Sequence, residues 1–284
     1  MKDNQQCKDT NFLELPYSER QLIVITSDEL ATATNEEKLS ALKREKSGVN
    51  WGRIAEAAVG AVVPFGNLAA EVVREGLRAW ARAKEVGLRV YLVSQSNAEK
   101  ITFPPGHPRD GVLYVGHPTQ AGVYYTMSEF HRVTFQHKFA EAVDMLMSLG
   151  AVELQVEHLA GWSKEFSASM EVGLPSADVS TKAHAGSKKA AADSLLFKAQ
   201  LSGSDAPKLP KNLVWYPHEP TWQSIAKGRL KYGLQDFSLQ VNYQDDFGIN
   251  VGLKVQANKV GLDLGGKFED HQSTVWRIQG KFKA

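Results

Sequence analysis

Cysteine is almost absent from this sequence, and long hydrophobic runs are absent altogether. Cys7 is the only cysteine among 284 residues, which excludes an intrachain disulfide framework and indicates a reducing compartment. The nearest approach to a membrane-spanning helix is residues 57–70, which fall short of the roughly 20 apolar residues required and are interrupted by Pro64 and Gly66. The N-terminal residues are polar and show no hydrophobic region of a secretory signal. We therefore expect a cytoplasmic protein.

An excess of one charge sign is also absent. The chain has 33 lysines and arginines against 32 aspartates and glutamates, which gives a formal net charge of +1. Such a balance gives the molecule as a whole no strong bias toward nucleic acid or membranes. We expect no nucleic-acid partner, and the candidates that we consider, a membrane lipid or another protein, rest on the local patterns described below.

Recognisable catalytic and cofactor motifs are missing as well. The sequence has no phosphate-binding loop, no dinucleotide-binding glycine pattern and no nucleophile elbow. Its eight histidines are dispersed, and only His107 and His117 share a setting, each in a Gly-His-Pro triplet. We interpret these two as turn residues rather than metal ligands, because no third ligand is near them in the sequence. The sequence thus predicts a non-enzymatic protein with no catalytic residue, no cofactor and no metal site.

What the sequence does contain is a succession of differently patterned regions. Residues 1–27 are loosely patterned, residues 28–87 are helical in character, and residues 88–284 form an antiparallel α+β body. In the helical region, one apolar segment either packs on a sheet or lies in a membrane surface. Its candidate membrane contacts are Val59, Val62, Val63 and Phe65. Farther along, Trp215 and Tyr216 are expected to anchor a proline-punctuated connector to the core.

From residue 88 onward, apolar and polar residues alternate with a period of two, which predicts β-strands. Predicted strands cover residues 88–94, 111–116, 121–127 and 152–158, and a helix covers residues 128–149. The clearest alternation predicts a C-terminal four-strand meander over residues 237–243, 249–255, 260–264 and 276–282. We therefore predict an α+β fold, in which an extended antiparallel sheet is covered on one face by the helices of residues 28–86 and 128–149.

One stretch breaks this alternation. Residues 176–194 hold small side chains and lysines, with no large apolar residue beyond Val179. Their flanks, residues 164–174 and 194–202, alternate and have the length of about 9–11 residues that a membrane-crossing strand needs. In pattern, this hairpin of residues 164–202 resembles the inserting hairpins of β-pore-forming proteins, including the gasdermin and perforin-like classes. Its candidate membrane or partner contacts are Phe166, Met170, Val172, Lys182, Lys188, Lys189, Leu195 and Phe197.

The resemblance implies a membrane-acting effector, such as a toxin or host-defence protein, that is recruited from the cytoplasm to a bilayer. Such a protein would act as a homo-oligomer, because an open strand edge in lipid leaves backbone amides unsatisfied. Three alternatives stay open. The protein is a soluble adaptor that contacts a partner through the long loop and residues 104–111, or it holds a lipid in a cavity, or residues 176–194 are an ordinary surface loop.

Overall fold

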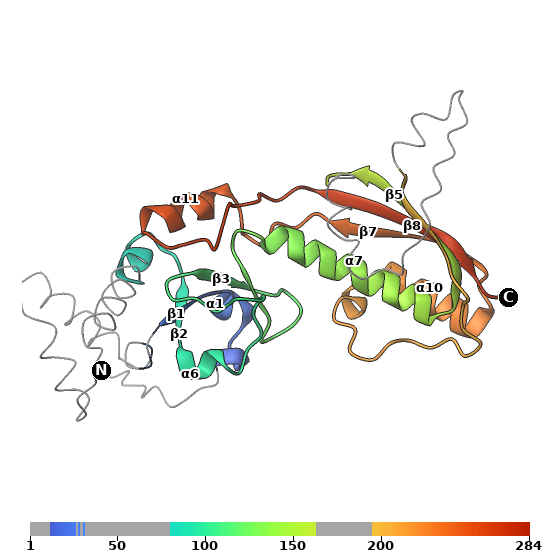
Figure 1. Ribbon diagram of the computed structural model, residues 1–284, viewed down its shortest axis with the longest axis horizontal. Helices are drawn as coiled ribbons and strands as arrows, with labels where there is room; N and C mark the ends of the chain where they lie inside the picture. Colours follow the sequence, from blue (N-terminus) through green and yellow to red (C-terminus); the bar gives the residue numbers. More distant parts are fainter. Residues whose placement is uncertain (1–11, 27, 29–30, 32–79, 163–194) are drawn as a thin grey trace, which may run out of the picture. The chain divides into compact units, whose positions relative to one another are not determined.

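The computed structural model describes residues 12–26, 28, 31, 80–162 and 195–284 (Figure 1). The chain forms two compact units that interleave along the sequence. Unit 1 comprises residues 1–130 and 247–270, and unit 2 comprises residues 131–246 and 271–284. Most of the predicted helical region of residues 28–87 lies outside the described residues, and so does the first arm of the predicted hairpin.

Unit 1 is built on a mixed four-stranded sheet with the strand order β2-β1-β3-β4. In this sheet, β1 (Leu22–Thr26) lies parallel to β2 (Val90–Ser94) and antiparallel to β3 (Leu113–Gly116), which in turn pairs with β4 (Tyr124–Thr126). The other elements of the unit are η1 (Phe12–Glu14), α1 (Tyr17–Arg20), α6 (Gln95–Ala98) and α11 (Val251–Lys259). A parallel pair needs a crossover connection, which the chain between β1 and β2 supplies.

Both faces of this sheet are covered, and β1 and β3 are buried at every position. On one face, Leu22 and Val24 belong to a core cluster that includes Ala257 of α11. On the other face, Ile23 and Ile25 belong to a second cluster that includes Phe12. An apolar run without alternation, such as residues 22–25, is typical of a strand that is buried on both sides.

Unit 2 contains an antiparallel four-stranded sheet with the order β6-β5-β8-β7. Its strands are β5 (Ala151–Ala160), β6 (Leu195–Gln200), β7 (Asp236–Tyr243) and β8 (Thr274–Phe282). Its helices are α7 (Phe130–Ser148), η2 (Tyr216–His218) and α10 (Pro220–Tyr232). Burial alternates strictly along β7, as expected for a sheet with one covered face and one wet face.

The two long helices of unit 2 cover the same face of its sheet (Figure 1). From α7, the Phe139 ring meets the Trp276 ring edge to face, with the centroids 5.0 Å apart. From α10, the guanidinium of Arg229 lies 5.1 Å from the centroid of the Phe282 ring. Trp276 and Phe282 are both buried and lie on the inner face of β8. The core of unit 2 is therefore an aromatic layer between these helices and the sheet.

The predicted α+β class is confirmed, and so is an antiparallel C-terminal sheet with helices on one face. The predicted helix of residues 128–149 is α7, and the predicted strands of residues 237–243 and 276–282 are β7 and β8. In the meander, however, the two middle strands are wrong. Residues 251–259 form α11, and β7 pairs directly with β8.

The error in the meander has a local physical cause. Val251, Leu253 and Val255 alternate with polar residues, but Asn250 precedes them and its side chain accepts a hydrogen bond from the backbone N–H of Leu253. An asparagine in this role is a helix N-cap. In the helix, Ala257 is buried whereas Val251 and Val255 are 50% and 45% exposed. The local cap at Asn250, rather than burial of the alternating apolar residues, thus favours a helix over the strand that the period indicated.

Candidate functional site

The segment that holds the predicted hairpin tip leaves and re-enters one sheet. It follows β5 and precedes β6, which are antiparallel neighbours with Glu157 paired to Leu195. Residues 163–194 therefore connect two adjacent strands rather than two units. Of the predicted contacts, the structure describes Leu195 and Phe197. The others, Val59, Val62, Val63, Phe65, Phe166, Met170, Val172, Lys182, Lys188 and Lys189, lie outside the described residues.

The last residues before this segment are fixed to the sheet. Gly161 has φ +82°, and a Cβ there would lie 2.2 Å from the Oγ1 atom of Thr274, so the position requires glycine. The backbone N–H of Trp162 donates to the same Oγ1 atom at 3.3 Å, and the carbonyl of Trp162 accepts from the indole N–H of Trp276 at 3.1 Å. The Trp162 ring also stacks on Tyr243. The chain is thus held in place as far as Trp162.

The strand that follows the segment, β6, is less buried than the other strands. All of its residues are half-buried or exposed, whereas every second residue of β7 is buried. Phe197 points to the core side, where its ring meets Phe139 with the centroids 6.3 Å apart. On the wet side, Lys198 forms an ion pair of 2.6 Å with Glu153. The Lys198 hydrogen bond is the main cause that lowers the pKa of Glu153.

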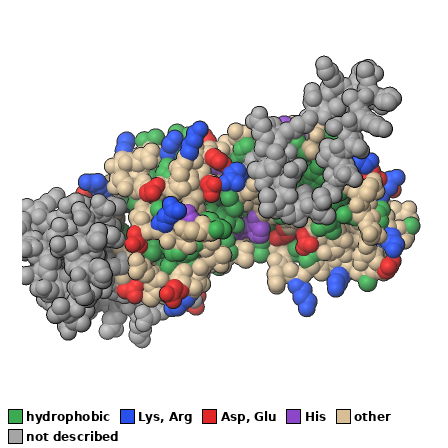
Figure 2. Space-filling model, viewed as in Figure 1, with side chains coloured by type: hydrophobic (Ala, Val, Ile, Leu, Met, Phe, Trp, Pro, Cys, Tyr) green, Lys and Arg blue, Asp and Glu red, His purple; other side chains and the backbone are tan. Residues whose placement is uncertain are grey.

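On the wet face of this sheet, charged side chains contact neighbouring side chains of opposite charge or amide groups. The Glu157 carboxylate accepts hydrogen bonds from the amides of Gln155 at 2.8 Å and Gln279 at 2.9 Å, and it lies 3.6 Å from Arg277. Acidic and basic side chains are likewise interspersed on the face of the molecule that Figure 2 shows. The carboxylates of this face are engaged with neighbours, which is typical of a solvated sheet surface and not of a paired acid and base.

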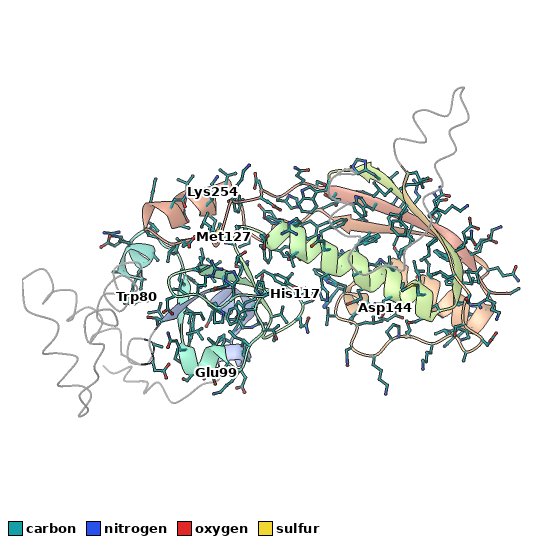
Figure 3. All side chains as sticks on the ribbon, viewed as in Figure 1. Trp80, Glu99, His117, Met127, Asp144 and Lys254 are labelled. Carbon is teal, nitrogen blue, oxygen red and sulfur yellow. The ribbon has the colours of Figure 1, made fainter. Side chains whose placement is uncertain are left out.

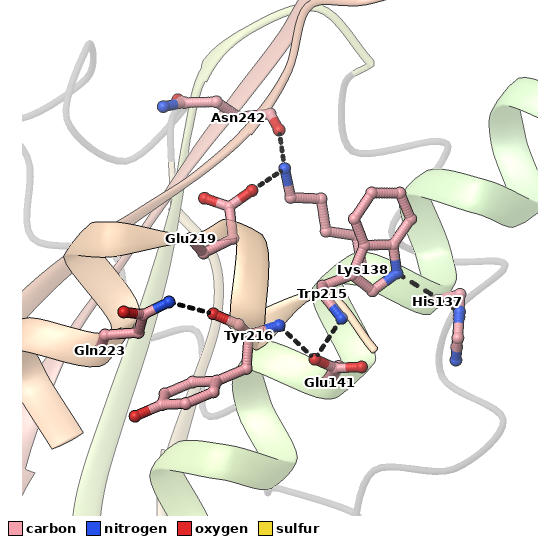
Figure 4. A network of polar contacts seen from close by, with 8 residues as sticks. All are labelled: His137, Lys138, Glu141, Trp215, Tyr216, Glu219, Gln223 and Asn242. Carbon is pink, nitrogen blue, oxygen red and sulfur yellow. Dashed lines mark hydrogen bonds and ion pairs between the residues drawn. The ribbon is translucent and has the colours of Figure 1, made fainter. Parts of the chain in front are cut away.

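A second anchor holds the connector that follows β6. The carboxylate of Glu141 on α7 accepts three backbone hydrogen bonds of 2.8 Å, from the N–H groups of Val214, Trp215 and Tyr216. Figure 4 shows the bonds from Trp215 and Tyr216. Glu141 is only 9% exposed. A carboxylate that accepts several amide hydrogen bonds fixes a loop more firmly than neutral groups do.

Lys138, one position after His137 on α7, extends this network. Its ammonium pairs with the Glu219 carboxylate, donates to the Asn242 carbonyl at 2.7 Å and lies 5.2 Å from the centroid of the Trp215 ring. The indole N–H of Trp215 donates to Nδ1 of His137 at 3.4 Å. Burial lowers the pKa of His137, and the nearby Glu141 charge opposes that effect. These contacts hold α7, the connector and β7 together, so the role of these residues is structural.

The two Gly-His-Pro histidines flank β3 in the sequence, His107 before the strand and His117 directly after it. Nδ1 of His107 is 2.7 Å from the hydroxyl of Tyr114, and burial followed by the Arg109 charge lowers the pKa of this histidine. His117, which Figure 3 labels, is fully buried. Its Nδ1 accepts from the backbone N–H groups of Thr119 and Gln120. Both side chains therefore have contacts that are typical of turn residues.

Among the described residues, no group of three or more histidine, cysteine, aspartate or glutamate side chains has the arrangement of a metal site. None of the described helices is long and apolar enough to cross a membrane.

Sequence reasoning missed the role of Glu141, because its three partners are 73 to 75 positions away along the chain. The one local signal was the Trp215–Tyr216 pair in the connector, since Trp215 is indeed 4% exposed. Comparison with known proteins does not identify a functional site, because no family model, no curated protein and no solved structure matches this chain.

Proposed function

We propose that this protein acts on membranes without catalysing a reaction, by presenting residues 163–194 to an anionic lipid surface. The observation that supports the proposal is the placement of this lysine-bearing segment. It is tied to the core at Trp162 and re-enters the same sheet at Leu195. If a loop is held in this way, it can contact lipid without any rearrangement of the sheet to which it is attached.

The part of the segment that would attract anionic lipid is residues 176–194, which contain Lys182, Lys188 and Lys189 against Asp178 and Asp193. The preceding residues 163–175 carry one lysine against two glutamates, so residues 163–194 as a whole are formally neutral. Each lysine near an anionic membrane contributes about 1 kcal/mol of binding free energy, and salt weakens the attraction. We therefore expect weak binding that requires anionic lipid and falls as the salt concentration rises.

A finer form of the proposal is insertion of the whole hairpin of residues 164–202, as in a pore-forming toxin or defence effector. Because β6 is paired with β5 and Phe197 contacts Phe139, this form requires β6 to leave the sheet. Insertion would also need several copies to close the strand edges. Surface binding requires neither event, so the two forms are separable by experiment.

The test uses vesicles of anionic and of neutral phospholipid. The full chain should float with anionic vesicles only, and a variant lacking residues 177–192 should stay in the soluble fraction. Release of an entrapped dye would support insertion, whereas flotation without release would support surface binding alone. If the full chain neither floats nor releases dye at any salt concentration, the membrane proposal is wrong.

The second candidate is a soluble adaptor that binds a protein partner. The packing of Phe197 against Phe139 favours it, because a side chain that serves the core is not available to lipid. Its second contact region is the loop of residues 104–111, which the Tyr114 hydroxyl holds through His107 and the backbone N–H of Arg109. A partner that still binds after deletion of residues 177–192, with no membrane binding by the full chain, would favour the adaptor.

A further inference from the structure

The free edge of β7 differs from the other strand edges of the two sheets. The edges are formed by β2, β4, β6 and β7. Of these strands β7 is the longest, with eight residues, and its register with β8 runs over eight pairs without a bulge. It also contains no lysine or proline, which proteins place on edges to prevent pairing, and its one charged residue, Asp236, is at its start. By contrast, β6 carries Lys198 and a register shift against β5, and β4 has only three residues.

The hydrogen-bonding groups of every second residue of β7 point away from β8. Phe282 donates its backbone N–H to the carbonyl of Gln235, so the backbone groups of Gln235 and of every second residue after it bond to β8. The N–H and C=O groups of Asp236, Ser238 and Gln240 therefore face outward. At the next outward position, the carbonyl of Asn242 already accepts from Lys138. Among the described residues, no backbone group pairs with the other three.

We propose that this edge pairs with the same edge of a second copy of the chain, as an antiparallel β7–β7 contact about a two-fold axis. A two-fold contact requires a surface that is complementary to itself. With Ser238 opposite Ser238 of the second copy, Asp236 lies opposite Gln240 of that copy. Three residue pairs then form, with about two hydrogen bonds each, and the two sheets become one.

Charge and neighbouring contacts select this register. A shift that places Asp236 opposite Asp236 of the second copy brings two carboxylates together, which is unfavourable. A shift toward the other end of the strand needs the Asn242 carbonyl, which Lys138 already occupies.

The contact is tested on the full chain in solution, without lipid, so that its failure is distinct from a failure of the membrane proposal. Sedimentation should show twice the monomer mass of 31.3 kDa for the native chain. The Ser238→Lys variant should be a monomer, because it places two lysines opposite each other across the axis. The Gln240→Lys variant should stay dimeric, because its lysine lies opposite Asp236 of the second copy.

These two variants add the same charge to the same exposed face of one strand, so each controls for the other. Circular dichroism of both should match that of the native chain, since Ser238 and Gln240 are exposed. A native chain that is monomeric at high micromolar concentration would overturn the proposal, and so would a Ser238→Lys variant that remains dimeric.

A cross-link tests the register independently. In a Cys7→Ser background, Ser238→Cys should form an interchain disulfide on mild oxidation, because the Cα atoms of an opposed hydrogen-bonded pair are about 5.5 Å apart. Gln240→Cys should not form one, because its opposite residue is Asp236. Cross-linking of Gln240→Cys but not of Ser238→Cys would refute this register.

Discussion

Replacement of Glu141 with alanine should destabilise unit 2 more than any substitution of an exposed carboxylate. The side chain accepts three backbone hydrogen bonds of 2.8 Å and is 9% exposed. Hydrogen bonds to charged groups stabilise by about 1.5–3 kcal/mol each, but their contributions are not additive. Since three amides would lose their acceptor together, we expect a loss of about 4 kcal/mol in the free energy of unfolding.

The glutamine variant separates the charge from the shape. In Glu141→Gln, the remaining carbonyl oxygen can still accept from Trp215 and Tyr216, but an NH2 group then faces the N–H of Val214. We expect a loss of about 2 kcal/mol, half that of the alanine variant. The matched control is Glu153→Ala, which removes an ion pair between the half-buried Glu153 and the exposed Lys198 and should cost only about 0.5 kcal/mol.

Urea unfolding followed by tryptophan fluorescence measures these changes. Four of the six tryptophans, Trp162, Trp215, Trp222 and Trp276, belong to unit 2, so the signal reports mainly on that unit. The reasoning would be refuted if Glu141→Ala lowered the stability no more than Glu153→Ala does.

Three further substitutions test the packing and the titration of unit 2. Phe139→Ala removes a buried ring that contacts Trp276 and Phe197 and should cost about 3–5 kcal/mol in the same urea assay; a cost under about 1 kcal/mol would contradict the aromatic layer. Gly280→Ala should prevent folding of the sheet, seen as loss of the circular dichroism signal, because the new Cβ would lie 1.9 Å from the Glu153 carbonyl oxygen. Burial lowers the pKa of His137 in the folded state, so the unfolded state binds more protons and stability should fall as the pH drops below about 6.5. In His137→Gln this fall should be smaller, and an unchanged pH profile would show that His137 has no part in it.

Much of unit 2 could be predicted from its sequence, because its helix and strands each bury one face. The period of two is clear in β7 and β8, and the helical spacing of residues 139–149 predicted α7. The same rule failed at α11, where three alternating apolar residues imitate a strand and only the cap at Asn250 indicates a helix. In unit 1, β1 carries no period because both its faces are buried, and a short apolar run of this kind does not distinguish a strand from a buried helix.

The candidate site was predictable only in part, for a physical reason. The alternation and similar length of its flanks marked residues 176–194 as a connection between strands, and β5 and β6 are indeed neighbours in one sheet. The anchors on either side depend on pairs that are distant in sequence. Trp162 meets Trp276 across 114 positions, and Glu141 meets Val214 across 73. Such contacts form when the sheet forms, and no local spacing encodes them.

The most direct test of the central claim is flotation of the full chain with anionic vesicles, compared between two triple variants. One replaces Lys182, Lys188 and Lys189 with glutamine, and the other replaces the exposed lysines Lys208, Lys211 and Lys231 in the same way. Both variants change the net charge equally, so general electrostatics affects them alike. The account predicts that only the first variant loses vesicle binding. Equal binding by the two variants would contradict the claim that residues 163–194 contact lipid.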